Sequence, residues 1–189
     1  MIIIIDNYDS FTYNISNIFS YLKFSVKIVK KEKINKIFKM DKIDFICLGP
    51  GTSFPRVKKF KIFKYNKHIP ILGICLGHQI IGKLFNCKIK KSIKILHGEK
   101  EKIVSKNNVF LNNIPIFSEF CRYNSLVIKK NSCLKKISFN KFKESMIISH
   151  NKYPIIGIQF HPESILSFYG IRILKNICLY FKNYVKKNK

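Results

Sequence analysis

The sequence contains no tryptophan and no alanine, and only 10 of its 189 residues are acidic. No apolar run approaches the roughly 18 residues that a membrane-spanning helix needs. The first residues, Met1–Asp6, carry neither the basic region nor the small-residue cleavage site of a secretory signal. We therefore expect a cytoplasmic protein with no membrane partner.

Cysteine is also sparse, with six residues and no Cys-x-x-Cys pair. This spacing argues against a zinc finger and a redox pair, and six cysteines are too few for a disulfide scaffold. Since export is not expected, we interpret them as reduced thiols, most of them small buried apolar side chains. They are Cys47, Cys75, Cys87, Cys121, Cys133 and Cys178.

The chain has an excess of positive charge, because 36 basic and 10 acidic residues give a formal net charge of +26. The lysines are scattered as doublets, such as Lys30-Lys31 and Lys129-Lys130, outside any nucleic-acid-binding motif. A nucleic-acid-binding protein concentrates its charge in a patch or an arm. We therefore favour lysine as a filler of solvated surface over binding to an acidic protein or to nucleic acid, and expect no nucleic-acid partner.

The length matches one domain, residues 1–189, and hydrophobic residues make up 47% of it, enough for a buried core. In the first half, short β-branched apolar runs alternate with amphipathic segments, which is typical of a parallel α/β sheet. The predicted strands are residues 2–5, 26–29, 43–48 and 69–74, and the predicted helices are residues 11–22, 57–66 and 80–85.

The second half is less regular. Between about 88 and 150 the apolar runs are short, for example 126–128 and 146–148, which favours antiparallel or peripheral strands. A further strand is predicted at 155–160. A final helix is predicted from an apolar stripe of Ile171, Leu174, Cys178, Phe181 and Val185. These elements predict an α/β fold: an open, mostly parallel twisted sheet flanked by helices, flavodoxin-like in architecture, with a small peripheral antiparallel sheet.

The segment Gly73–Gly77 (Gly-Ile-Cys-Leu-Gly) has the pattern of a nucleophile elbow with cysteine at its centre. A sharp turn from strand to helix projects the central side chain above the carboxyl ends of the strands, where open α/β sheets bind ligands. The flanking glycines permit close backbone approach, and the positive end of the helix favours a thiolate. The alternative is that Cys75 is a buried thiol beside ordinary glycines.

A cysteine nucleophile needs a base and a group that orients it. Of the five histidines, His161 is the best candidate, because it follows an apolar strand and would lie at the same sheet edge as Cys75. Glu163 is close enough in sequence to bind its ring and fix the tautomer. His78 begins the same helix as Cys75 and is expected to point elsewhere. The alternative for His161-Pro162-Glu163 is a solvated turn.

A second glycine-containing turn, Gly49-Pro50-Gly51, closes another predicted strand at that edge. Backbone N–H groups beside Gly51, together with that of Leu76, could form an oxyanion hole, in which one donor is typically worth roughly 10²–10³ in rate. The alternative is an ordinary turn.

Five segments occur in the order of a known family; they are Asp6–Asn14, Gly49–Gly51, Gly73–Gln79, Arg122–Leu126 and Gly157–Ser164. Together they strongly resemble the class I (triad) glutamine amidotransferases. The first segment is the narrower feature and is similar to the small subunit, component II, of anthranilate synthase and of aminodeoxychorismate synthase. The resemblance spans nearly the whole chain and implies the fold of that class.

The resemblance also implies a reaction. Cys75 attacks the side-chain amide of L-glutamine to give a thioester and ammonia, His161 moves the proton, and Glu163 orients His161. Water then releases glutamate. The positions that match substrate-binding or oxyanion-binding residues of the family are Gly49, Pro50, Gly51, Leu76, Gln79, Ser125 and Leu126.

The partner implied by the resemblance is a larger, chorismate-binding subunit, component I, which receives the ammonia. This chain then needs no cofactor and no metal, since magnesium belongs to the partner. We favour anthranilate, and hence tryptophan synthesis, over aminodeoxychorismate and folate synthesis. A non-catalytic scaffold subunit and a stand-alone hydrolase of another γ-glutamyl substrate are the remaining alternatives.

Two positions depart from the pattern of the family. Leu48 stands where relatives usually carry proline, and Asn124 stands where they usually carry histidine. Asparagine can still donate a hydrogen bond but cannot become cationic. Since Ser125 and Leu126 contribute mainly backbone, we expect glutamine binding to be retained.

Overall fold

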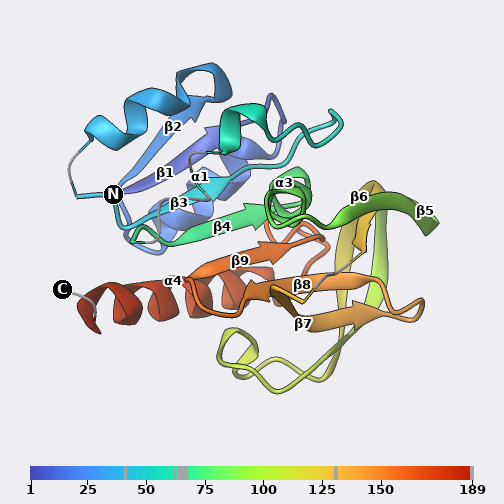
Figure 1. Ribbon diagram of the computed structural model, residues 1–189. Coiled ribbons are helices and arrows are strands. Elements are labelled where there is room, and N and C mark those ends of the chain that lie inside the picture. The colour runs from blue at the N-terminus through green and yellow to red at the C-terminus, as the bar shows by residue number, and fades with distance from the viewer. Residues whose placement is uncertain (41, 62, 64–67, 130–131, 188–189) are drawn as a thin grey trace.

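The computed structural model describes residues 1–189 except 41, 62, 64–67, 130–131 and 188–189. Its described strands form one nine-stranded sheet in the order β2-β1-β3-β4-β9-β8-β7-β5-β6, with helices on both faces (Figure 1). The strands are β1 (Ile2–Asp6), β2 (Val26–Lys30), β3 (Phe45–Leu48), β4 (Ile71–Ile74), β5 (Lys88–Ser105), β6 (Phe117–Lys129), β7 (Leu134–Asn140), β8 (Ser145–His150) and β9 (Ile155–Ile158).

The first five strands in this order, from β2 to β9, are parallel. They are short, and β1, β3, β4 and β9 are almost fully buried, because helices cover both of their faces. The strands predicted at 2–5, 26–29, 43–48, 69–74 and 155–160 are therefore confirmed, with shifts of a few residues at their ends.

The remaining strands, β8, β7, β5 and β6, are antiparallel and extend the same sheet. They confirm the antiparallel strands that were predicted between 88 and 150. They are longer than the sequence pattern indicates, above all β5 with 18 residues and β6 with 13. In β5 few side chains are buried, and lysines occupy exposed positions, so the apolar signal of this strand is weak.

The helices are α1 (Thr12–Tyr21), α3 (Leu76–Leu84) and α4 (Gly170–Lys187). The 3₁₀ segments are η1 (Lys31–Lys39), η2 (Lys58–Phe60) and η3 (Val109–Leu111). Side chains that alternate along β1 serve two cores: Ile2 and Ile4 pack with α1 and α4, whereas Ile3 and Ile5 pack with α3.

Several details differ from the prediction. Residues 58–60 of the predicted helix 57–66 form a 3₁₀ turn, whereas positions 62 and 64–67 lie outside the described residues. The 3₁₀ segment η1 is not predicted by the periodicity. In α4 the buried stripe runs through Ile173 and Ile177, and Ile171 is 46% exposed, because the helix is turned slightly from the expected face.

Among the described helices, none is long and apolar enough to cross a membrane.

His78 is a fully buried titratable group of α3, placed against the backbone of Gly157. Burial lowers its pKa to about 4, against a smaller opposite effect of the Gly157 backbone. The unfolded chain takes up this proton near pH 6.5, and the folded chain only near pH 4. The free energy of unfolding contributed by this group therefore falls as the pH decreases from 6.5 to 4.

We predict that the free energy of unfolding of His78→Leu falls by about 3 kcal/mol less between pH 7 and pH 4 than that of the wild type. Urea unfolding at several pH values measures this difference. His68→Leu, which removes an exposed imidazole, is the matched control. Equal losses of stability in the wild type and in His78→Leu would contradict the prediction.

Candidate functional site

Cys75 lies between the end of β4 and the start of α3, as the elbow pattern predicts. Its backbone angles, φ 51° and ψ −101°, are rare for a residue with a side chain. The Cys75 N–H donates to the Ile158 carbonyl at 2.8 Å, which ties the turn to β9. A Cβ at Gly77 would lie 2.0 Å from the Leu48 carbonyl oxygen, so only glycine lets the helix start this close to β3.

His161 and Glu163 follow β9 at the same edge of the sheet. The His161 N–H donates to the Cys121 carbonyl at 2.9 Å, and the Ser167 hydroxyl donates to the His161 carbonyl at 2.6 Å. The His161 Nδ1 lies 2.6 Å from Glu163 Oε1, and both side chains are buried. The pair is thus a buried ionisable pair rather than a solvated turn.

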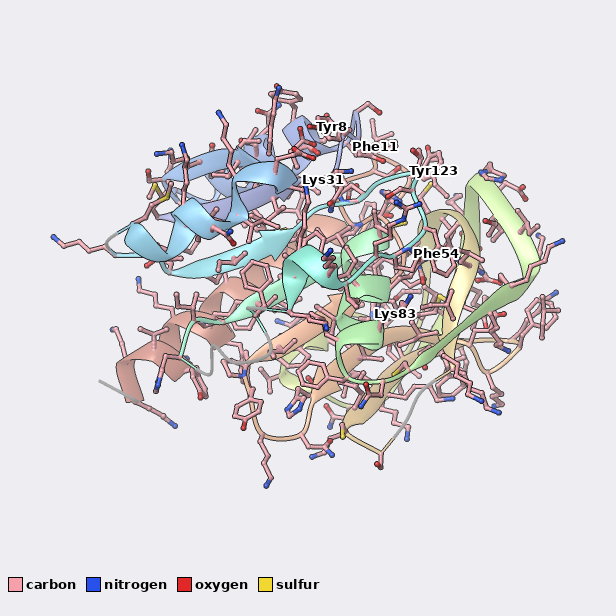
Figure 2. All side chains as sticks on the ribbon, turned by 45° about the horizontal axis from the view of Figure 1, so that its top comes forward. Tyr8, Phe11, Lys31, Phe54, Lys83 and Tyr123 are labelled. Atoms are coloured by element: carbon pink, nitrogen blue, oxygen red, sulfur yellow. The ribbon has the colours of Figure 1, made fainter. Side chains whose placement is uncertain are left out.

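Two aromatic rings enclose the imidazole of His161. The ring centroid of Phe11 lies 5.2 Å from it, and that of Tyr123 lies 5.1 Å from it in an edge-on arrangement. Figure 2 shows Phe11 and Tyr123 next to one another, and their centroids are 5.0 Å apart. Phe11 was predicted on the apolar face of a helix, but it precedes α1 and faces the site.

Burial alone would lower the pKa of His161. The charge of Cys75 and the hydrogen bond and charge of Glu163 outweigh it, so that the pKa of His161 is well above its ordinary value. This arrangement favours the imidazolium form of His161. Away from the site, burial raises the pKa of the Cys47 thiol well above its usual range and that of Cys178 to about 12.

The turn Gly49–Gly51 lies beside the elbow. The buried Asn7 donates its side-chain N–H to the Gly49 carbonyl at 2.8 Å, and the Gly49 N–H donates to the Ile5 carbonyl at 3.0 Å. A Cβ at Gly51 would lie 2.6 Å from a methyl carbon of Leu76, so the turn packs directly on the start of α3. The first N–H groups of a helix have no partner within it, and that of Leu76 belongs to this set.

A cavity of about 340 Å³ lies at this edge. Six of the ten predicted site residues line it, and Glu163 lies behind His161, outside the lining. Gly49, Pro50 and Leu76 are also outside the lining. The lining residues are Asp9, Ser10, Phe11, Gly51, Thr52, Ser53, Cys75, Gln79, His97, Tyr123, Asn124, Ser125, Leu126 and His161.

Side-chain amides connect the cavity wall to the sulfur. The Gln79 Nε2 donates to the Leu126 carbonyl at 2.9 Å and to Gln159 Oε1 at 3.3 Å. The Gln159 Nε2 lies 3.9 Å from Cys75 Sγ, within reach of an N–H···S hydrogen bond. No functional role was predicted for Gln159, Phe11 or Tyr123, although all three lie in segments that carry the family resemblance.

Within the described part of the chain, no three His, Cys, Asp or Glu side chains come together as the ligands of a metal ion would.

Fold and site together define an α/β protein in which a cysteine at a strand–helix turn shares a cavity with a buried His-Glu pair. The chain matches the family "Glutamine amidotransferase class-I" over residues 3–180, and it belongs to that family. The fold class predicted from the sequence is thereby confirmed.

Relatives and solved structures agree with this membership. The chain is 40% identical to "Anthranilate synthase component 2" of Cyanophora paradoxa, over 93% of this chain and 97% of that protein. It is 33% identical to "Aminodeoxychorismate/anthranilate synthase component 2" of Bacillus subtilis, over 93% and 94%. A solved protein of Thermoplasma acidophilum, described as a GMP synthase subunit, has the same fold with a TM-score of 0.88 at 22% identity, covering 99% of this chain and 96% of that one.

We predict that Gly77→Ala destabilises the protein by roughly 3 kcal/mol and slows alkylation of Cys75, because the new methyl group must push α3 away from the Leu48 carbonyl. Thermal unfolding and mass-monitored alkylation measure the two effects. Lys83→Ala is the control in the same helix, since the Lys83 ammonium lies outward, 4.8 Å from the Phe54 ring centroid (Figure 2). A Gly77→Ala protein with wild-type stability would contradict the packing argument.

Proposed function

We propose that this chain is the glutamine-hydrolysing subunit of anthranilate synthase and passes ammonia to a chorismate-binding partner. The observation that carries the proposal is that Cys75 and His161 line one cavity, with His161 held 2.6 Å from the buried Glu163. This is the order nucleophile, proton carrier and orienting carboxylate that acyl transfer requires.

In the proposed reaction, Cys75 Sγ attacks the side-chain amide carbon of glutamine. The carbon–nitrogen bond breaks as the imidazolium of His161 donates its proton to the leaving nitrogen, so that ammonia and a thioester form. A water molecule then attacks the thioester, and His161 takes up the water's proton. The sulfur leaves as thiolate, and glutamate is released.

Backbone N–H groups of Leu76 and near Gly51 would bind the oxyanion of both tetrahedral intermediates. The close packing of Gly51 on the Leu76 side chain supports this role, because it holds the Gly49–Gly51 turn beside the start of α3. Gln79, Ser125 and Leu126 also line the cavity, where they would bind the amino-acid end of glutamine. Among the residues that the structure describes, no lysine or arginine lines the cavity, so their positive charge does not enter the proposed substrate site.

The proposed partner and pathway rest on the names of the relatives. The first relatives are named for anthranilate synthase, and they match almost the full length of this chain. Aminodeoxychorismate synthase is the second candidate, because the relatives from Bacillus subtilis and Escherichia coli carry that name. In either case this subunit is proposed to need no metal or cofactor, magnesium being held by the partner, and to act in the cytoplasm.

The test is reconstitution with the large subunit from the same genome, chorismate, magnesium and glutamine, followed by identification of the aminated product by fluorescence and mass. Anthranilate is the expected product.

We predict that Cys75→Ser abolishes synthesis from glutamine and leaves synthesis from ammonium unchanged, because only the nucleophile is lost. Cys133→Ser, at an exposed position, is the matched control.

Aminodeoxychorismate as product would replace the first candidate by the second. Product from ammonium but none from glutamine in the wild type would favour the scaffold subunit. Rapid glutamine hydrolysis without any partner would favour a stand-alone hydrolase.

We predict that Glu163→Gln lowers the rate of glutamine hydrolysis roughly 10- to 100-fold. The variant keeps the shape of the side chain but removes a charge that raises the pKa of His161. The imidazolium then loses its proton at lower pH, so the alkaline limb of the pH–rate profile shifts to lower pH. Glu119→Gln, at an exposed position of β6, is the control. An unshifted alkaline limb would refute this role for Glu163.

A further inference from the structure

A buried ion pair lies behind the cavity wall in the antiparallel part of the sheet. Arg122 in β6 is fully buried and contacts Glu101 of β5 through its guanidinium. A second nitrogen of the guanidinium, Nη2, donates to the Ser92 hydroxyl at 3.1 Å. Glu144 accepts from the Ser92 hydroxyl at 2.9 Å and from the Asn140 amide at 2.9 Å. The guanidinium is therefore held on several sides and cannot turn.

This ion pair fixes the orientation of Asn124. Arg122 Nε donates to Asn124 Oδ1 at 3.0 Å, and arginine has no acceptor that would allow the reverse. The Asn124 Nδ2 must then face the other way, and it donates to the Leu126 carbonyl at 2.9 Å. Asn124 is 4% exposed, so water does not compete for these bonds.

The Leu126 carbonyl is the second point that sets direction. A carbonyl can only accept, so Gln79 presents its Nε2 there, at 2.9 Å. The second hydrogen of that nitrogen points to Gln159 Oε1 at 3.3 Å. With its oxygen so engaged, Gln159 turns its own nitrogen to Cys75 Sγ, 3.9 Å away. Gln159 is fully buried.

We propose that Asn124 and Gln159 are positioning residues of a directed hydrogen-bond chain that runs from the Arg122 ion pair to the Cys75 sulfur. Asn124 holds the Leu126 carbonyl in place, and this carbonyl orients the Gln79 amide at the cavity wall. Gln79 orients Gln159, which presents an N–H group to the thiolate rather than a lone pair. The Gln79 oxygen is left free to accept from the ammonium group of a bound amino acid. The inference rests on the proposed function, because it assumes that the cavity holds glutamine.

If this hydrogen-bond chain operates, replacing Asn124 and replacing Gln159 should affect different properties, glutamine binding and the reactivity of the sulfur. Asn124→Leu should weaken glutamine binding more than it changes the sulfur, because the Leu126 carbonyl belongs to the backbone of β6 and still accepts from Gln79. Gln159→Glu, which has the same shape, should place a carboxylate beside the thiolate and raise the pH at which Cys75 becomes reactive. A residue that merely supported the fold would move neither measurement selectively.

The experiment alkylates Cys75 in the full chain with two probes over a range of pH. Iodoacetamide reports the reactivity of the sulfur, and a chloroketone analogue of glutamine, which loses chloride as the S–C bond forms, also reports glutamine binding. We expect Asn124→Leu to react with the analogue roughly tenfold more slowly, the equivalent of one lost hydrogen bond, and to lose less of its rate with iodoacetamide. Asn124→His should restore the rate, since imidazole offers one donor and one acceptor.

Asn176→Leu is the matched control. It removes an amide of α4 that binds the Phe110 and Asn112 carbonyls and takes no part in the hydrogen bonds from Arg122 to Cys75. Wild-type rates with both probes in Asn124→Leu, or an unchanged pH profile in Gln159→Glu, would overturn the proposal. Should Gln159→Glu fail to fold, as judged by circular dichroism, the Asn124 pair decides alone. A wild-type chain that reacts with iodoacetamide but not with the analogue would instead overturn the proposed function.

Discussion

The parallel pairing of β4 with β9 is the contact on which the site depends. Gly73 lies opposite Gly157 and Ile74 opposite Ile158, so both strands end at the same level of the sheet. Cys75 follows at once and is tied to β9 through the Ile158 carbonyl, in a backbone conformation that few residues adopt. The turn that carries His161 begins from the same strand. A shift of this register by one residue would turn every side chain of one strand to the other face.

Charge is strongly segregated in this molecule. The chain carries a formal net charge of +26, yet no lysine or arginine in the described part of the chain lines the cavity beside Cys75. Besides Asp9 in the lining, two buried pairs lie near it, His161 with Glu163 and Arg122 with Glu101. A buried group that keeps a fixed partner also keeps a fixed orientation, because leaving the partner exposes an uncompensated charge. Both pairs thus orient groups at the cavity, whereas the surface lysines place their positive charge outside it.

Much of the parallel part could be predicted, because its strands are continuous apolar runs such as Ile2–Ile5 and its helices have a regular apolar face. The elbow around Cys75 could also be predicted, since its glycines permit the close backbone contacts that the sharp turn requires. The long strands β5 and β6 could not be delimited, because exposed lysines interrupt the pattern of β5, polar residues interrupt that of β6, and the two strands stabilise each other by pairing. The environment of His161 depends on Phe11 and Tyr123, which come from two distant segments.

The sequence by itself determined the strands and helices around the site, the position of the glycines that allow the turn at Cys75, and the membership of this chain in a family. These properties follow from periodicity, steric limits and local motifs, which act over a few neighbouring residues. Only the tertiary structure decided the pKa of His161 and the direction of the amides from Arg122 to Gln159. Both depend on charges and dipoles that come within a few ångströms only when the sheet is assembled, in an interior where water does not screen them.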